Sequence, residues 1–183
     1  SQGKKMYRYL SRCLLVVISQ VSLADGITIG VGQTCQNNIK MTTPNSRYQI
    51  LNNGTEVKDL LTGLIWQRCS LGQLWDGSTC TGTATKYTWQ QALEAANSVG
   101  GGWILPNIKE LSSLANRACF NPAINSIVFP NTYSSRDYDD AIWSSSPDSY
   151  NSQLAWVVFS SLGTSYNYGK GYTGTVRLMR ASQ

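Results

Sequence analysis

The middle of this chain contains two sequence patterns that are typical of helix starts. The other apolar runs of the predicted domain are too short for helices and suit strands. Thr88 precedes a run of helical period and has Gln91 three residues later, which is the pattern of a capping box. Asn107 and Glu110 repeat this spacing before a second helix, and the glycines of residues 100–102 end the first. The order predicts an α+β domain in which two helices pack on a small twisted antiparallel sheet with long polar loops.

Strands are expected where short apolar or alternating runs are bounded by turn residues. Before the helices these runs cover residues 48–51, 55–59 and 64–68, and the last two form a hairpin around Thr62 and Gly63. Between and after the helices the strand-like runs are residues 103–105, 127–129, 141–143, 155–159 and 175–179. We interpret residues 165–172 as a polar loop.

The beginning of the chain resembles a secretory signal peptide over residues 1–24. Basic residues precede an apolar run, and Ser22 and Ala24 supply the small residues of a cleavage site. The run is far below the ~20 apolar residues that a membrane span requires. We therefore expect an extended arm over residues 25–47, a domain over residues 48–183, and a secreted, periplasmic or cell-surface protein without a membrane span.

Charge argues against a nucleic-acid partner. The chain has 15 basic and 10 acidic residues, and four of the basic ones lie in the leader at Lys4, Lys5, Arg8 and Arg12. Removal of the leader leaves 11 basic against 10 acidic residues. No dense basic stripe remains that could follow a phosphate backbone.

Four cysteines follow the leader, and disulfides are the default for an even number in an exported chain. Four cysteines allow three connectivities. We expect Cys69–Cys80, which closes a short loop, and Cys35–Cys119, which ties the arm to the end of the second helix. A zinc site is not expected, because the chain has no histidine and no Cys-x-x-Cys motif.

The lack of histidine also excludes a Ser-His-acid triad and a Cys-His pair. Carboxylates remain, and three of them cluster at Asp137, Asp139 and Asp140. This cluster suits either a calcium loop or a solvated acidic turn, and its spacing, which matches no calcium-loop pattern, favours the turn. No cofactor is expected.

Tyrosine, asparagine, serine and glycine gather in two late segments, and these residue types are typical of binding loops. An ordinary polar β-loop would have a similar composition. Recognition residues usually lie on loops held by a rigid scaffold, which makes these segments the candidate ligand site. The candidate residues are Tyr150, Asn151, Tyr166, Asn167, Tyr168, Lys170 and Tyr172.

Five tryptophans lie within apolar patterns and are expected in the core: Trp66, Trp89, Trp103, Trp143 and Trp156. Trp75 differs, since it lies in a polar segment between two cysteines. We interpret it as either a loop anchor or an exposed contact.

Several phrases together resemble the Lcl C-terminal domain family of bacterial surface proteins. They are GWILPNIKEL at residues 102–111, AIWSSSP at 141–147, AWVVF at 155–159 and VRLMR at 176–180, supported by DLLTGLIW at 59–66 and YTWQQA at 87–92. The resemblance implies a C-type-lectin-like fold and deployment at the surface or outside the cell. Some relatives bind sulfated polysaccharides, and in others a retroelement diversifies the C-terminal loops. It implies no catalytic residue.

These observations predict an exported bacterial binding module, not an enzyme, whose loops recognise an extracellular glycan or protein. Two alternatives stay open. One is a hydrolase that uses carboxylates, and the other is a structural subunit of a surface assembly joined through the arm. The sequence does not indicate an oligomeric state.

Overall fold

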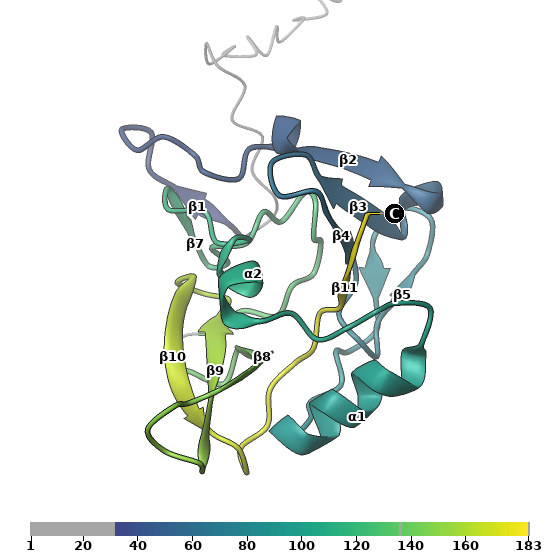
Figure 1. The fold of residues 1–183 in the computed structure, drawn as a ribbon. Helices are drawn as coiled ribbons and strands as arrows, with labels where there is room; N and C mark the ends of the chain where they lie inside the picture. The colour runs from purple at the N-terminus through teal and green to yellow at the C-terminus, as the bar shows by residue number, and fades with distance from the viewer. Residues whose placement is uncertain (1–31, 136, 183) are drawn as a thin grey trace, which may run out of the picture.

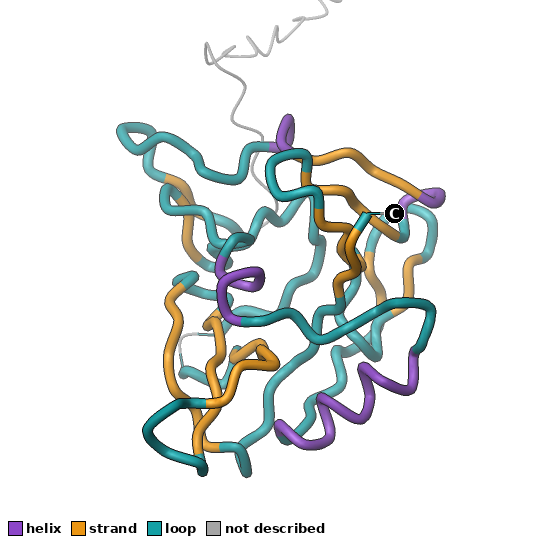
Figure 2. Tube along the Cα trace, in the orientation of Figure 1, coloured by secondary structure: helices purple, strands orange, loops and turns teal. Residues whose placement is uncertain are grey.

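A computed structural model describes residues 32–135 and 137–182 of the chain. The predicted leader and the first residues of the predicted arm, 25–31, lie outside this range. Within it, two α-helices and eleven short strands are joined by long loops (Figure 2). The α+β class predicted from the sequence is confirmed. No helix in this part of the chain has the length and apolar character needed to cross a membrane.

The described strands form four small antiparallel sheets, not the single sheet that was predicted. The largest has the order β11–β4–β3–β2, with β2 at Tyr48–Leu51, β3 at Glu56–Asp59, β4 at Leu64–Gln67 and β11 at Met179–Ala181. A three-stranded sheet has the order β10–β9–β8, with β8 at Ala141–Pro147, β9 at Leu154–Phe159 and β10 at Thr164–Gly169. Two-stranded ladders pair β1 (Thr34–Cys35) with β7 (Cys119–Phe120) and β5 (Leu74–Trp75) with β6 (Cys80–Thr81).

Both predicted helices form, and each begins with its capping box. Helix α1 covers Trp89–Val99, where the Thr88 amide donates to the Gln91 side chain at 2.9 Å. Helix α2 covers only Ile108–Ser112, and the Glu110 amide donates to the Asn107 side chain at 2.9 Å. In Figure 1, α2 lies above the three-stranded sheet and α1 lies beside it.

The three-stranded sheet separates two apolar clusters, because alternate residues of a strand point to opposite faces. Val158 faces the cluster that contains Leu111 of α2, and Val157 faces the cluster that contains Ala92 of α1. Of the five tryptophans expected in the core, Trp66 and Trp143 are fully buried, while the other three are half-buried. The sheet is therefore held on both faces and forms a rigid platform.

The strand predicted at residues 127–129 is wrong. The Asn125 side chain accepts hydrogen bonds from the amides of Ile127 and Val128, both at 3.0 Å. These two backbone amides are therefore used in a local turn and are not available for pairing with a neighbouring strand. Two other predicted strands are shorter in the structure. Residues 103–105 form only an isolated bridge, between Ile104 and Met179. Most of residues 175–179 lies outside any strand.

The loop predicted at residues 165–172 is also wrong over most of its length. Residues Thr164–Gly169 form β10, which pairs with β9 in unbroken register from Thr164↔Phe159 to Gly169↔Leu154. The segment can be polar and still form a strand because β10 lies at the edge of the sheet, where one side of the strand has no neighbouring strand. Only the turn after Gly169 is a loop.

The described part of the arm packs on the domain. The Gln33 side chain is buried and donates to the carbonyl oxygens of Pro122 at 2.8 Å and Ile124 at 2.9 Å. Both predicted disulfides, Cys35–Cys119 and Cys69–Cys80, are confirmed. The first joins β1 to β7, so it fixes the arm to the segment that follows α2.

Candidate ligand-binding site

The two segments singled out from the sequence lie next to each other. The turn between β8 and β9 contains Tyr150 and Asn151, and the turn after β10 contains Lys170 and Tyr172. The Lys170 amide donates to the Gln153 carbonyl oxygen at 2.9 Å. Hairpin geometry therefore brings both turns to the same end of the three-stranded sheet.

Asp148 organises the first turn. One of its carboxylate oxygens accepts from the amides of Tyr150 and Asn151, both at 2.8 Å, and the other accepts from the Asn167 side chain. These bonds, led by that from the Tyr150 amide, lower the pKa of Asp148 below its ordinary value. Asn167 is thus held by Asp148 on the opposite face of β10 from Tyr166 and Tyr168.

Lys170 has a structural role. Its ammonium donates to the Ser152 carbonyl oxygen at 2.8 Å and lies 4.2 Å from the centroid of the Trp89 ring. The Trp89 indole in turn donates to the Ser144 carbonyl oxygen at 2.9 Å. The lysine therefore couples both turns to the start of α1, whereas the sequence analysis placed it among the candidate ligand-binding residues.

Tyrosines from β10 and its turn form a continuous aromatic row. The Tyr168 ring lies 5.1 Å from Tyr172, 5.9 Å from Phe159 and 5.6 Å from Trp143, measured between centroids. Tyr166, two residues away on the same face, lies 6.4 Å from Phe159. Tyr166 and Tyr172 remain 63% and 64% exposed, so their rings are available to a partner.

A further tyrosine joins this row from the loop before β8. Tyr138 is 63% exposed, and its ring packs edge-on against Phe159 with centroids 5.6 Å apart. Tyr138 was not among the residues predicted for the site, because its segment resembles a solvated acidic turn. The only signal was composition, since residues 133–138 include serine and tyrosine like the other binding segments.

We call Tyr138, Tyr166, Tyr168 and Tyr172 the tyrosine surface. Phe159, 6% exposed, lies beneath three of them and holds their spacing. Three of the seven predicted site residues belong to this surface. The other four do not: Asn167 and Lys170 are engaged in internal contacts, and Tyr150 and Asn151 lie on the adjoining turn, where Tyr150 is 99% exposed.

The acidic cluster is bonded internally. Asp139 accepts from Tyr133 at 2.8 Å and pairs with Lys86 at 3.1 Å, and hydrogen bonds from Ser135, Tyr133 and Lys86 lower its pKa to about 2. Asp140 is buried and accepts from the Ser161 amide at 2.6 Å. Within residues 32–135 and 137–182, no group of three or more acidic or cysteine side chains is arranged to hold a metal ion.

The chain matches a known protein family. A family model described as the Lcl C-terminal domain matches residues 55–180. This range contains both helices, the three-stranded sheet and the whole tyrosine surface. No curated protein matches the chain.

Proposed function

Because the chain belongs to the Lcl C-terminal domain family, which is associated with the cell surface, we propose that it is an exported bacterial binding module with a C-type-lectin-like fold. Its ligand is an extracellular glycan or protein. The module binds this ligand without catalysis. The observation that carries the proposal is the tyrosine surface.

Tyrosine suits recognition because its ring is large, amphipathic and rigid, and only two torsions are ordered on binding. In the tyrosine surface Tyr166 and Tyr168 stand on the paired strand β10. Tyr138 and Tyr172 come from loops but pack on Phe159 and Tyr168, so little further ordering is needed. Tyr138, Tyr166 and Tyr172 are more than 60% exposed. The first two touch an aromatic base at Phe159, and the third packs on Tyr168. A row of rings supported in this way offers stacking area to a sugar ring or an apolar side chain.

The disulfides support export. Cys35–Cys119 and Cys69–Cys80 account for every cysteine of the described residues. Such bonds persist in oxidising compartments and are rare in the cytosol. They agree with the leader-like sequence of residues 1–24.

The carboxylates support binding over hydrolysis. A hydrolase of the carboxylate type needs an acid and a base or nucleophile that face one bond. Near the tyrosine surface, Asp139 is paired with Lys86, Asp140 is buried against Ser160 and Ser161, and Asp148 accepts from two backbone amides. Each is thus committed to holding a loop.

We expect the Tyr166→Ala/Tyr172→Ala variant to lose binding to whichever glycans or proteins the unaltered chain retains on immobilised arrays. Both rings are mostly exposed, so the fold should tolerate their loss, whereas a ligand would lose two stacking contacts. Loss of a central anchor typically costs about 2 kcal/mol or more, which corresponds to roughly thirtyfold in affinity. Titration of each array hit by surface plasmon resonance measures the change.

Tyr150→Ala is the matched control, since Tyr150 is 99% exposed but lies outside the tyrosine surface. This variant should bind within about twofold of the unaltered chain, as is usual for residues at the edge of an interface. Equal affinity of the double variant and the unaltered chain, with both folded by circular dichroism, would reject the tyrosine surface as the binding site.

A further inference from the structure

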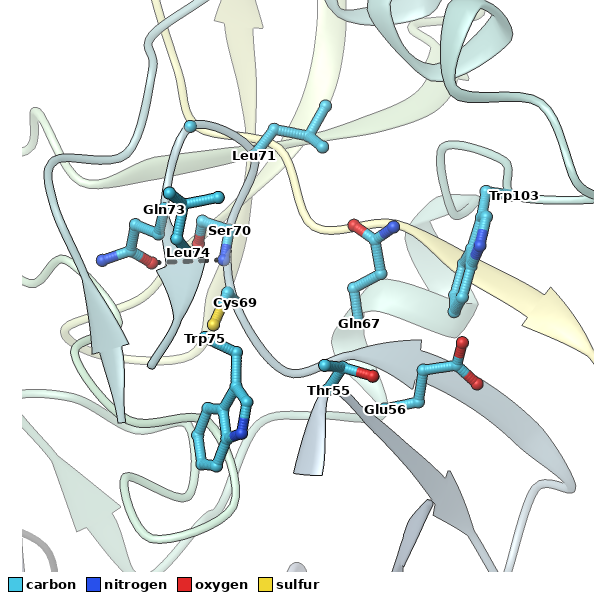
Figure 3. Close-up of a pocket in the computed structure, with 11 residues that line it drawn as sticks. Thr55, Glu56, Gln67, Cys69, Ser70, Leu71, Gln73, Leu74, Trp75 and Trp103 are labelled. Atoms are coloured by element: carbon cyan, nitrogen blue, oxygen red, sulfur yellow. Dashed lines mark hydrogen bonds between the residues drawn. The ribbon is translucent and has the colours of Figure 1, made fainter. Parts of the chain in front are cut away.

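A groove on the four-stranded sheet lies apart from the tyrosine surface. Its volume is about 310 Å³, within the range of small-ligand sites. The floor comes from β3 and β4, one wall from residues 69–75, and the other from Trp103. Figure 3 shows the Gln67 amide projecting between the segment that carries Ser70 and the Trp103 ring.

The floor of the groove is polar because it is the outer face of the sheet. Glu56 and Gln67 are direct cross-strand partners, so their side chains share one face, while Val57 and Trp66 point into the core. Among the described residues, the Gln67 side chain has no hydrogen-bond partner. Its amide thus offers a donor and an acceptor.

An arginine beside the groove neutralises the Glu56 carboxylate of its floor. The Arg180 guanidinium donates to the Glu56 carboxylate at 2.8 Å and lies 5.1 Å from the centroid of the Trp103 ring. The opposite charges cancel, and the Glu56 carboxylate keeps further hydrogen-bonding positions. The site therefore favours an uncharged polar ligand over an anion.

One wall carries a tryptophan that is fixed from several sides. The Trp75 indole donates to the Asn53 carbonyl oxygen at 3.1 Å, and the Arg68 guanidinium lies 4.3 Å from the ring centroid. Gly54 admits the ring, because a Cβ there would lie 2.7 Å from it. Trp75 is therefore a loop anchor, which was one of the two alternatives left open by the sequence. It also lines an accessible groove, which is close to the other alternative, an exposed contact.

The segment that bears this wall is locked in shape. The Cys69–Cys80 disulfide closes it, and the Gln73 side chain accepts from the Ser70 amide at 3.2 Å and donates to the Asn131 carbonyl oxygen at 3.1 Å. Despite these constraints Leu74 is 75% exposed. A rigid loop that keeps apolar side chains at the surface is the form expected of a preorganised binding site.

We propose that this groove is a second binding site, which takes an uncharged saccharide ring. Indole rings match the apolar C–H face of a sugar, and the Gln67 amide and the Glu56 carboxylate can bond its neighbouring hydroxyl groups. An apolar peptide is the competing ligand for the tryptophans and Leu74. The polar floor favours the saccharide, because a peptide side chain would leave those groups without partners.

The test follows the tryptophan indole N–H signals of the full chain by ¹H–¹⁵N NMR while cellotetraose, maltotetraose or N-acetylated chitotetraose is added to millimolar concentration. We expect at least one of the three to shift the signals of Trp75 and Trp103 and to leave those of the buried Trp66 and Trp143 in place. Gln67→Ala and Trp103→Ala, tested separately, should each weaken that effect by about tenfold or more.

The Tyr166→Ala/Tyr172→Ala variant should keep the same indole shifts, since neither residue lines the groove. This outcome separates the groove from the tyrosine surface. No indole shift with any of the three tetrasaccharides would overturn the proposal. Shifts produced only by a leucine-rich peptide would also overturn it and assign the groove to peptide docking.

Discussion

Replacement of Cys35 and Cys119 together by alanine should lower the free energy of unfolding by about 4–5 kcal/mol. The bond joins residues 84 positions apart, so its loss frees a long loop of the unfolded chain. The same change releases β1 from β7, which removes the geometry that seats Gln33 on the carbonyl oxygens of Pro122 and Ile124. Urea denaturation at neutral pH, followed by tryptophan fluorescence, measures the loss.

The second disulfide is the matched comparison. Cys69 and Cys80 are only 11 positions apart, so the Cys69→Ala/Cys80→Ala variant should lose about 3 kcal/mol. If the Cys35 and Cys119 variant lost less than the Cys69 and Cys80 variant, loop closure would not be the main contribution of the long bond.

Arg177→Ala should destabilise the domain by roughly 4 kcal/mol, because it removes a large buried side chain and leaves buried acceptors without donors. Arg177 is 0% exposed. Its guanidinium donates to the Gln67 carbonyl oxygen at 3.1 Å, to Thr132 Oγ1 at 2.9 Å, to Ser70 Oγ at 3.2 Å, and to the Arg68 carbonyl oxygen. One side chain thus joins the segment after β4 to the segment before β8.

The same residue predicts a dependence on pH. Burial, with a smaller effect of the Arg68 charge, lowers the pKa of Arg177 from its ordinary value to about 9. The unfolded chain therefore holds this proton more tightly than the native state does. The contribution of Arg177 to the free energy of unfolding should be constant well below pH 9 and should rise as the pH increases above about 9.

Chemical denaturation at neutral pH compares three variants. Arg177→Met keeps most of the volume beside Phe129 and should cost less than Arg177→Ala. Arg117→Ala, which alters an exposed arginine, should stay within about 0.5 kcal/mol of the unaltered chain. A change below about 1 kcal/mol for Arg177→Ala would contradict the role given to its hydrogen bonds.

Features fixed by neighbouring residues could be predicted from the sequence. The capping boxes at Thr88 and Asn107 form as expected because donor and acceptor lie three residues apart. The hairpin of β3 and β4 follows from alternation and a Thr-Gly turn. The sequence allows three cysteine connectivities, and Cys35 reaches Cys119 because the arm folds back onto the domain.

Features decided by distant contacts could not be predicted. The segment of β10 is polar enough to suggest a loop, and only its ladder with β9 makes it a strand. At residues 127–129 the apolar run suggested a strand, yet the Asn125 side chain bonds the backbone locally. Tyr138 joins the tyrosine surface through Phe159, a residue 21 positions later in the chain, which no local pattern reveals.

The central claim is that the tyrosine surface meets the ligand. Backbone ¹H–¹⁵N NMR spectra of the full chain, recorded with the strongest array hit at saturation, test it most directly. We expect the largest shifts in residues 137–138 and 164–172, with weaker shifts in the turn that contains Tyr150. Shifts confined to other parts of the chain, with the signals of Tyr138, Tyr166 and Tyr172 unchanged, would contradict the claim.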